Sequence, residues 1–139
     1  MMHILDLIVE NGTDASETLA PPGVGGNITE PAEVRRAIGG RVALIGGLDQ
    51  HHILTHGTLA EIRAEVRRLF EGFGPDGGYI MSASDHFFET PVENLQAYAA
   101  AARECRYSSW GALQYQRDPG ELRQSHLLCT FLLLALVLG

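Results

Sequence analysis

The sequence of 139 residues contains no lysine, and its 10 Lys-or-Arg positions are all arginine. A lysine nucleophile or a lysine Schiff base is therefore excluded. Cysteine is also scarce: Cys105 and Cys129 are too few for a disulfide framework or for a zinc site made of cysteine alone. This cysteine usage is the default of a reducing compartment, so we expect a cytoplasmic protein.

Basic charge is in short supply, because 17 acidic residues outnumber the 10 arginines and leave a net charge of -7 at pH 7. Such a charge repels nucleic acid and anionic membrane surfaces, and neither is an expected partner. Asp6 and Glu10 interrupt the first apolar stretch, and no cationic start precedes it, so no signal peptide is expected.

A long hydrophobic run is lacking as well. The apolar stretch at residues 127–138 is shorter than the roughly 17–25 residues that span a bilayer. A buried helix or strand, or a truncated or aberrant end, is favoured there over a membrane span. The glycine-rich nucleotide motifs and the Gly-x-Ser-x-Gly elbow are also missing, so a nucleotide site and a serine hydrolase are not expected.

What is present is a globular composition, with 45% hydrophobic and 19% charged residues, of a length typical of one domain. Thr58–Glu61 and Thr90–Glu93 fit capping boxes, in which a Thr and a Glu bond each other's backbone amides at a helix start. Near-continuous apolar runs indicate strands covered on both faces. We expect helices near residues 2–10, 30–39, 58–73 and 91–105, and strands near 14–19, 41–46 and 78–83.

Strands that alternate with helices predict an α/β fold with parallel βα units. A complete (β/α)8 barrel needs eight such units and about 250 residues. With three strands, residues 1–107 form either a small open sheet or a partial barrel. Residues 108–139 lack this alternation, so we expect a separate, irregular tail that packs poorly on the first part.

Ligands of parallel α/β folds bind beyond the carboxyl ends of the strands. In the loop after the third strand, Asp85 and His86 offer a carboxylate and an imidazole that can move a proton or bind a metal. The alternative is local, with Ser84 or Asp85 capping the turn and His86 filling a polar gap.

Asp49, after the second strand, can either hold pyrrole or amine protons or form an Asx-turn.

Three histidines follow in the same loop. His51, His52 and His56 have the composition of a metal cluster, but the helix is expected to begin only at residue 58, so they need not share a face. Surface loop histidines are the favoured interpretation.

Several segments together resemble the last third of the uroporphyrinogen decarboxylase superfamily. They are GGLDQ at 46–50, LTHGT at 54–58, EIRAEV at 61–66, GGYI at 77–80, DH at 85–86 and TPVENL at 90–95. The resemblance covers residues 1–107 and implies a (β/α)8 TIM barrel, of which this chain supplies roughly strands six to eight. It implies a carboxy-lyase that acts on a tetrapyrrole in porphyrin biosynthesis without a cofactor.

In the decarboxylase a histidine lines the porphyrinogen pocket after the last strand, and His86 stands at the matching position. The residues assigned to catalysis are His86 and Asp49, and those assigned to substrate binding are Gly47, Gln50, Ser84, Asp85 and Phe87.

Two alternatives stay open. Cobalamin-linked methyltransferases of the same superfamily hold zinc through a His-x-Cys pair and a later Cys, and they act on a methyl donor. This chain has His86 where they have Cys, which leaves zinc binding by His86 or Asp85 as the alternative. The other alternative is a non-catalytic, truncated half barrel. Because the first half of the barrel, with the decarboxylase's catalytic aspartate, is absent, we expect the isolated chain to be inactive. The open strand edges make a homodimer a candidate assembly.

Overall fold

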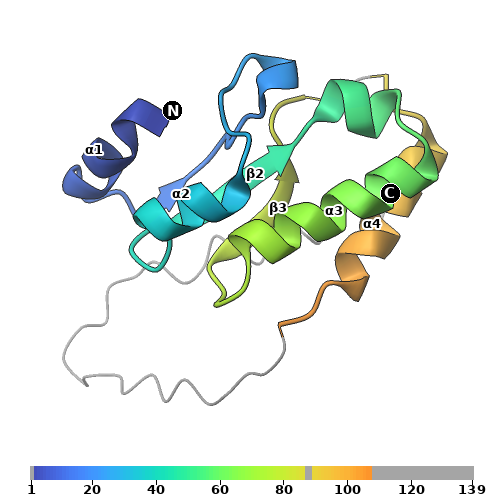
Figure 1. The fold of residues 1–139 in the computed structure, drawn as a ribbon. Coiled ribbons are helices and arrows are strands. Elements are labelled where there is room, and N and C mark those ends of the chain that lie inside the picture. Colours follow the sequence, from blue (N-terminus) through green and yellow to red (C-terminus); the bar gives the residue numbers. More distant parts are fainter. Residues whose placement is uncertain (1, 87–88, 108–139) are drawn as a thin grey trace, which may run out of the picture. The chain divides into compact units, whose positions relative to one another are not determined.

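The computed structural model describes residues 2–86 and 89–107, which form an α/β unit with three parallel strands (Figure 1). The strands are β1 (Ala15–Ser16), β2 (Ala43–Leu48) and β3 (Tyr79–Ala83), in the spatial order β1-β2-β3. Both neighbouring pairs are parallel, with Leu44 opposite Tyr79 and Leu48 opposite Ala83. The expected parallel βα arrangement is therefore confirmed.

The helices alternate with the strands, and α2 and α3 lie on one face of the sheet (Figure 1). In chain order the helical elements are the 3-10 turn η1 (Met2–Ile4), α1 (Leu5–Glu10), the 3-10 turn η2 (Pro22–Val24), α2 (Pro31–Ile38), the π-helix η3 (Gln50–Thr55), α3 (Leu59–Phe73) and α4 (Val92–Glu104). None of the helices in the described part of the chain is both long enough and apolar enough to cross a membrane. The tail expected at 108–139 lies outside the described residues.

Two of the strands differ from the sequence prediction in length or position. β1 has only two residues, because Thr18 adopts a left-handed conformation with φ of 60° and turns the chain out of the sheet. β2 begins and ends two residues later than expected, since its pairing with β3 continues as far as Leu48. Leu19 is nevertheless completely buried, so the segment after β1 still contributes to the core.

The helix starts show how tertiary contacts compete with local ones. At α3 the capping box is confirmed: the Thr58 amide donates to Glu61 at 2.7 Å, and the Glu61 amide donates to the Thr58 hydroxyl at 3.3 Å. The box expected at Thr90 is wrong, because the Thr90 hydroxyl bonds the hydroxyl of Thr55 at 2.8 Å. Pro91 takes the N-cap position of α4 without a side-chain cap.

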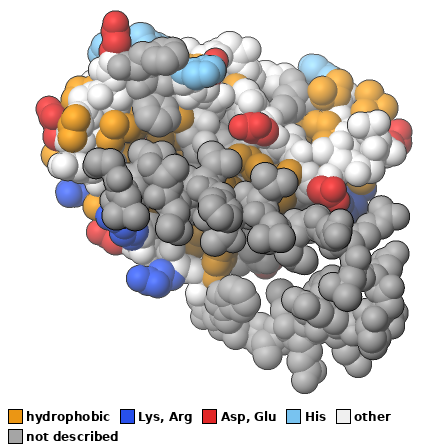
Figure 2. Space-filling model, turned by 180° about the vertical axis from the view of Figure 1, so that it is seen from behind, with side chains coloured by type: hydrophobic (Ala, Val, Ile, Leu, Met, Phe, Trp, Pro, Cys, Tyr) orange, Lys and Arg blue, Asp and Glu red, His pale blue; other side chains and the backbone are white. Residues whose placement is uncertain are grey.

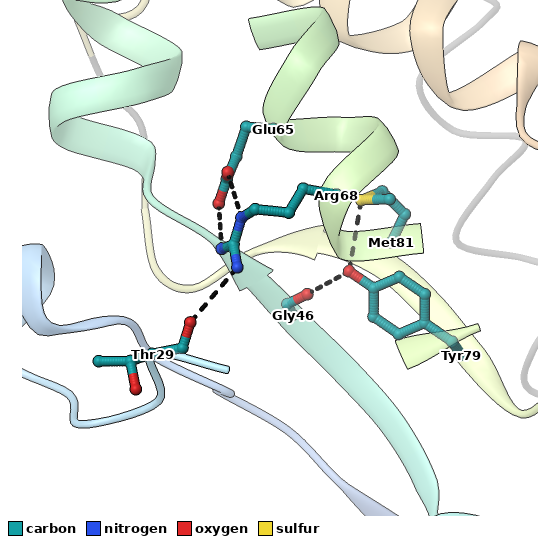
Figure 3. Close-up of polar contacts among 6 residues, drawn as sticks. All are labelled: Thr29, Gly46, Glu65, Arg68, Tyr79 and Met81. Carbon is teal, nitrogen blue, oxygen red and sulfur yellow. Dashed lines mark hydrogen bonds and ion pairs between the residues drawn. The ribbon is translucent and has the colours of Figure 1, made fainter. Parts of the chain in front are cut away.

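The core lies between the sheet and its helix layer. Phe73 of α3 is fully buried and its ring lies 5.0 Å from that of Tyr79 on β3. The Tyr79 hydroxyl donates to the backbone carbonyl of Gly46 at 2.7 Å and contacts the sulfur of Met81 at 3.3 Å (Figure 3). Burial raises the pKa of Tyr79 far above its ordinary value, so this hydroxyl remains a donor at physiological pH.

One ion pair on α3 also holds the segment before α2. Arg68 binds both oxygens of Glu65 at 2.7 Å, and its second Nη donates to the carbonyl of Thr29 at 3.3 Å (Figure 3). The bond to Glu65 raises the pKa of Arg68. Glu65 and Arg68 are three residues apart on α3, a spacing at which opposite charges stabilise a helix.

Gly47 provides a test of the packing between β2 and α3. Its φ is +98°, and a Cβ atom added there would lie 2.8 Å from Cε2 of Phe73. Gly77 has a similar φ of +89° with nothing within 4 Å of its added Cβ. We expect Gly77→Ala to lower the free energy of unfolding by about 1 kcal/mol and Gly47→Ala by about 3 kcal/mol, because only the latter also overpacks the core. Denaturant titration of both variants measures the difference, and equal losses would contradict this account.

Candidate functional site

The carboxyl ends of β2 and β3 lie side by side. The Ser84 amide donates to the carbonyl of Leu48 at 2.9 Å, so the residues that follow the two strands begin at the same level. We call this end of the sheet the carboxyl edge. Figure 1 shows η2, η3 and the segment after β3 gathered there. Figure 2, the view from behind, shows histidine side chains along this upper rim.

Asp49 makes three polar contacts at the carboxyl edge. Its Oδ1 accepts the backbone amides of His51 at 3.0 Å and His52 at 2.7 Å, and its Oδ2 lies 3.0 Å from Nδ1 of His52. The side chain is only 10% exposed. Asp49 is thus the N-cap of η3, which is the turn-forming role that the sequence left open for it.

The loop at residues 21–27 covers Asp49, as its position after β1 predicts. A Cβ atom added to Gly23 would lie 2.3 Å from Oδ2 of Asp49 and 3.0 Å from Nδ1 of His52. The glycine backbone therefore lies directly on these two side chains. Loops after β1, β2 and β3 do meet at one edge.

The π-helix η3 replaces the loop expected between β2 and α3. The Asp49 cap begins it, and its Leu54 is buried. Asn94 of α4 holds its far end: Nδ2 donates to the carbonyls of Leu54 at 2.9 Å, Gly57 at 3.3 Å and Thr55 at 3.4 Å. Sequence reasoning gave Asn94 no role of its own. Its spacing of three and seven residues from the buried Ala97 and Ala101 is the signal that would have indicated a buried amide.

Asp85 and His86 form an exposed pair at the end of β3. Oδ1 of Asp85 accepts the backbone amide of His86 at 2.8 Å and also contacts its Nδ1. These two bonds, the backbone bond first, hold the pKa of Asp85 below its usual range. The side chains are 66% and 76% exposed, so the pair faces solvent, as a ligand-binding residue of the edge would.

The other residues assigned to substrate binding are wholly or partly buried or lie outside the described residues. Gly47 is buried against Phe73, so packing accounts for a glycine there. Oε1 of Gln50 and Oγ of Ser84 are buried and have no hydrogen-bond partner within residues 2–86 and 89–107. Phe87 lies outside the described residues.

The described residues do not by themselves fit a metal ion. Among them, no three His, Cys, Asp or Glu side chains are arranged to hold one. Asp85 and His86 supply two ligands at most. The rings of His51, His52 and His56 contact edge to face, with centroids 4.8 and 4.7 Å apart, which is ring packing and not a ligand set. Zinc at this edge would need ligands from elsewhere.

A family profile described as uroporphyrinogen decarboxylase (URO-D) matches residues 2–105. The chain belongs to the URO-D family. A methyltransferase from Methanosarcina mazei has a similar solved structure, with a TM-score of 0.52 and 26% identity over 73% of this chain and 27% of that one. No curated protein matches the sequence. The family resemblance is confirmed, and this chain spans about a quarter of that methyltransferase.

The role of Asn94 can be measured by its removal. Asn94→Ala leaves carbonyls of η3 without their buried donor, so we expect the free energy of unfolding to fall by about 2 kcal/mol. Gln96→Ala, two residues away on the exposed face of α4, is the matched control and should change it by less than about 0.5 kcal/mol. Equal effects in thermal or denaturant unfolding would show that the Asn94 bonds contribute little.

The lowered pKa of Asp85 predicts a specific pH response. Because the folded pKa is depressed, the Asp85–His86 contacts stabilise the edge above the ordinary carboxyl pKa and are lost as the pH falls through the lowered value. In a carbon-detected NMR titration we expect the Asp85 carboxyl to titrate below the usual value of about 3.9. His86→Ala should return the pKa only part of the way, since the backbone bond remains. If the pKa of Asp85 returned fully to its ordinary value, the His86 ring alone would account for the lowered pKa.

Proposed function

We propose that the described unit supplies strands six to eight of a (β/α)8 barrel and the C-terminal part of the active site of a URO-D-like carboxy-lyase that acts on a tetrapyrrole. One observation carries the proposal: the polar segments that follow β2 and β3 begin at the same level of the carboxyl edge, the end where barrel enzymes bind their substrates. The family match over residues 2–105 supports the reaction class.

In this proposal the residues of the carboxyl edge handle charge and protons. Decarboxylation of an acetate arm leaves an electron pair that must be stabilised and then receive a proton. His86, exposed at the end of β3, supplies an imidazole suited to proton transfer near neutral pH. The buried Oε1 of Gln50 and Oγ of Ser84 supply an acceptor and a hydroxyl for polar groups of the substrate.

The proposed reaction needs more of the barrel than the described residues contain. The chain spans 27% of the M. mazei methyltransferase, and three of eight strands leave most of a barrel mouth to be supplied. We therefore expect the isolated chain to be inactive and the complete site to include residues from other barrel strands. A cytoplasmic location and a small-molecule substrate belong to the same proposal.

A zinc-dependent methyl transfer is the second candidate, favoured by the structural likeness to a methyltransferase. Asp85 and His86 would be the ligands of this chain, and the bound zinc would activate a thiol substrate. The two described ligands do not complete a zinc site, so this candidate depends on further ligands from other segments. A non-catalytic half barrel, alone or as a homodimer, is the remaining alternative.

The deciding experiment expresses the chain together with any coding sequence upstream of Met1. Carbon dioxide release from uroporphyrinogen, methyl transfer to a thiol and bound zinc are then measured on one preparation. We expect carbon dioxide release without stoichiometric zinc. Methyl transfer with stoichiometric zinc would support the second candidate, and neither activity would support a non-catalytic half barrel.

The residue test uses His86→Ala in the same assay. An exposed histidine packs little core, so we expect turnover to fall by about 10²–10⁴-fold while the melting temperature stays the same. His3→Ala, an exposed histidine in the 3-10 turn before α1, is the matched control and should keep full turnover. If His86→Ala keeps its activity and melts several degrees lower, His86 is a packing residue.

A further inference from the structure

The contact between Asp49 and His52 has the geometry of a proton-transfer pair. Oδ2 of Asp49 lies 3.0 Å from Nδ1 of His52, while Oδ1 is already occupied by two backbone amides. An ionised carboxylate only accepts hydrogen bonds, so a favourable contact requires the proton on Nδ1. His52 is then held in the tautomer whose Nε2 carries the free lone pair.

The exposure of the two side chains divides their roles. The Asp49 side chain is 10% exposed, whereas that of His52 is 58% exposed. In an imidazole ring Nε2 lies across from Nδ1, so it points away from the buried carboxylate. A substrate at the carboxyl edge can therefore reach Nε2 of His52 but meets little of Asp49.

The loop at residues 21–27 preserves this contact. Gly23 approaches so closely that an added Cβ would overlap Oδ2 of Asp49, at 2.3 Å. On its other side the His52 ring packs edge to face on His51, with centroids 4.8 Å apart. The imidazole is thus oriented by a carboxylate, a glycine backbone and a second ring, which is the kind of support that a reacting group needs.

We propose that His52 is a proton-transferring residue of the site and that Asp49 is its positioning residue. Nε2 of His52 takes the proton of a substrate X–H group, such as a thiol or a pyrrole N–H. The X–H electron pair stays on X, and the imidazolium that forms is stabilised by the Asp49 carboxylate. The reverse step returns the proton. This role rests on the proposed function; the sequence analysis assigned Asp49 to catalysis without naming a partner for it.

The first test reads the pair itself, without any substrate. The full 139-residue chain is labelled with ¹⁵N-histidine and observed at a pH well above the ordinary histidine pKa of about 6.5. Long-range ¹H–¹⁵N correlation should show His52 with a protonated Nδ1 and a bare Nε2. His51 and His56, on the same π-helical segment and its C-cap, are the internal references.

Two variants separate the Asp49–His52 pair from the helix cap. Asp49→Asn presents an amide that can donate to Nδ1, so it should remove or reverse the tautomer preference. Gly23→Ala should do the same by forcing the two side chains apart. With diethyl pyrocarbonate as the probe, we expect His52 to be acylated severalfold faster than His51 in the natural chain, and this advantage should vanish in both variants.

His52→Asn then tests the functional role. Its amide can replace Nδ1 as the donor to Asp49 but offers no Nε2, so the melting temperature should stay unchanged while turnover in the assay above is lost. A His52 whose tautomer and acylation rate match those of His51 and His56 would overturn the pair. If His52→Asn keeps full turnover, the Asp49–His52 pair is a structural contact and His52 transfers no proton. If neither activity is found while the tautomer is fixed, the proposed function fails and the pair stands.

Discussion

The in-register parallel pairing of β2 with β3 is the constraint on which the rest of this structure depends. It runs from Leu44 and Tyr79 to Leu48 and Ala83, and the Ser84 amide extends it by one more bond. Because parallel strands end on the same side, the pairing delivers two independent loops to one edge. A shift of register would move the loop after β3 away from Asp49 and would separate the groups that the proposed site combines.

The two ends of the sheet are built differently. At the amino end Arg35 of α2 donates to the carbonyl of Gly77 at 2.7 Å and pairs with Asp76, so a side chain from the helix layer satisfies the polar groups of the turn before β3. At the carboxyl edge Gln50 and Ser84 keep buried polar atoms without a partner in the described part of the chain. Unsatisfied buried groups cost stability, and proteins retain them where a ligand or water completes them. This contrast between the two ends supports the proposal that a ligand binds at the carboxyl edge, as ligands do in barrel enzymes.

Local signals in the sequence were reliable where no distant group competed for the same atoms. The capping box at Thr58 formed because both of its partners lie within one helical turn. The equivalent pattern at Thr90 failed because the hydroxyl of Thr55, 35 residues away, was a better placed partner. The π-helix at residues 50–55 was missed for the same reason: Asn94, some 40 residues later, supplies the donors that hold its carbonyls. The two partners of each contact lie 35 to 40 residues apart, so no short stretch of sequence contains both of them.

The sequence by itself determined the α/β class, the order of helices and strands, the family, and the edge at which Asp49, Asp85 and His86 lie. Hydrophobic periodicity and glycine or proline breaks carry that information, and they act over a few residues. Only the tertiary structure decided that Asp49 binds His52 and caps η3, with Gly23 lying on the pair. The reason is physical: the partner of a buried carboxylate is decided by which donors the fold brings within about 3 Å, and sequence spacing does not report that distance.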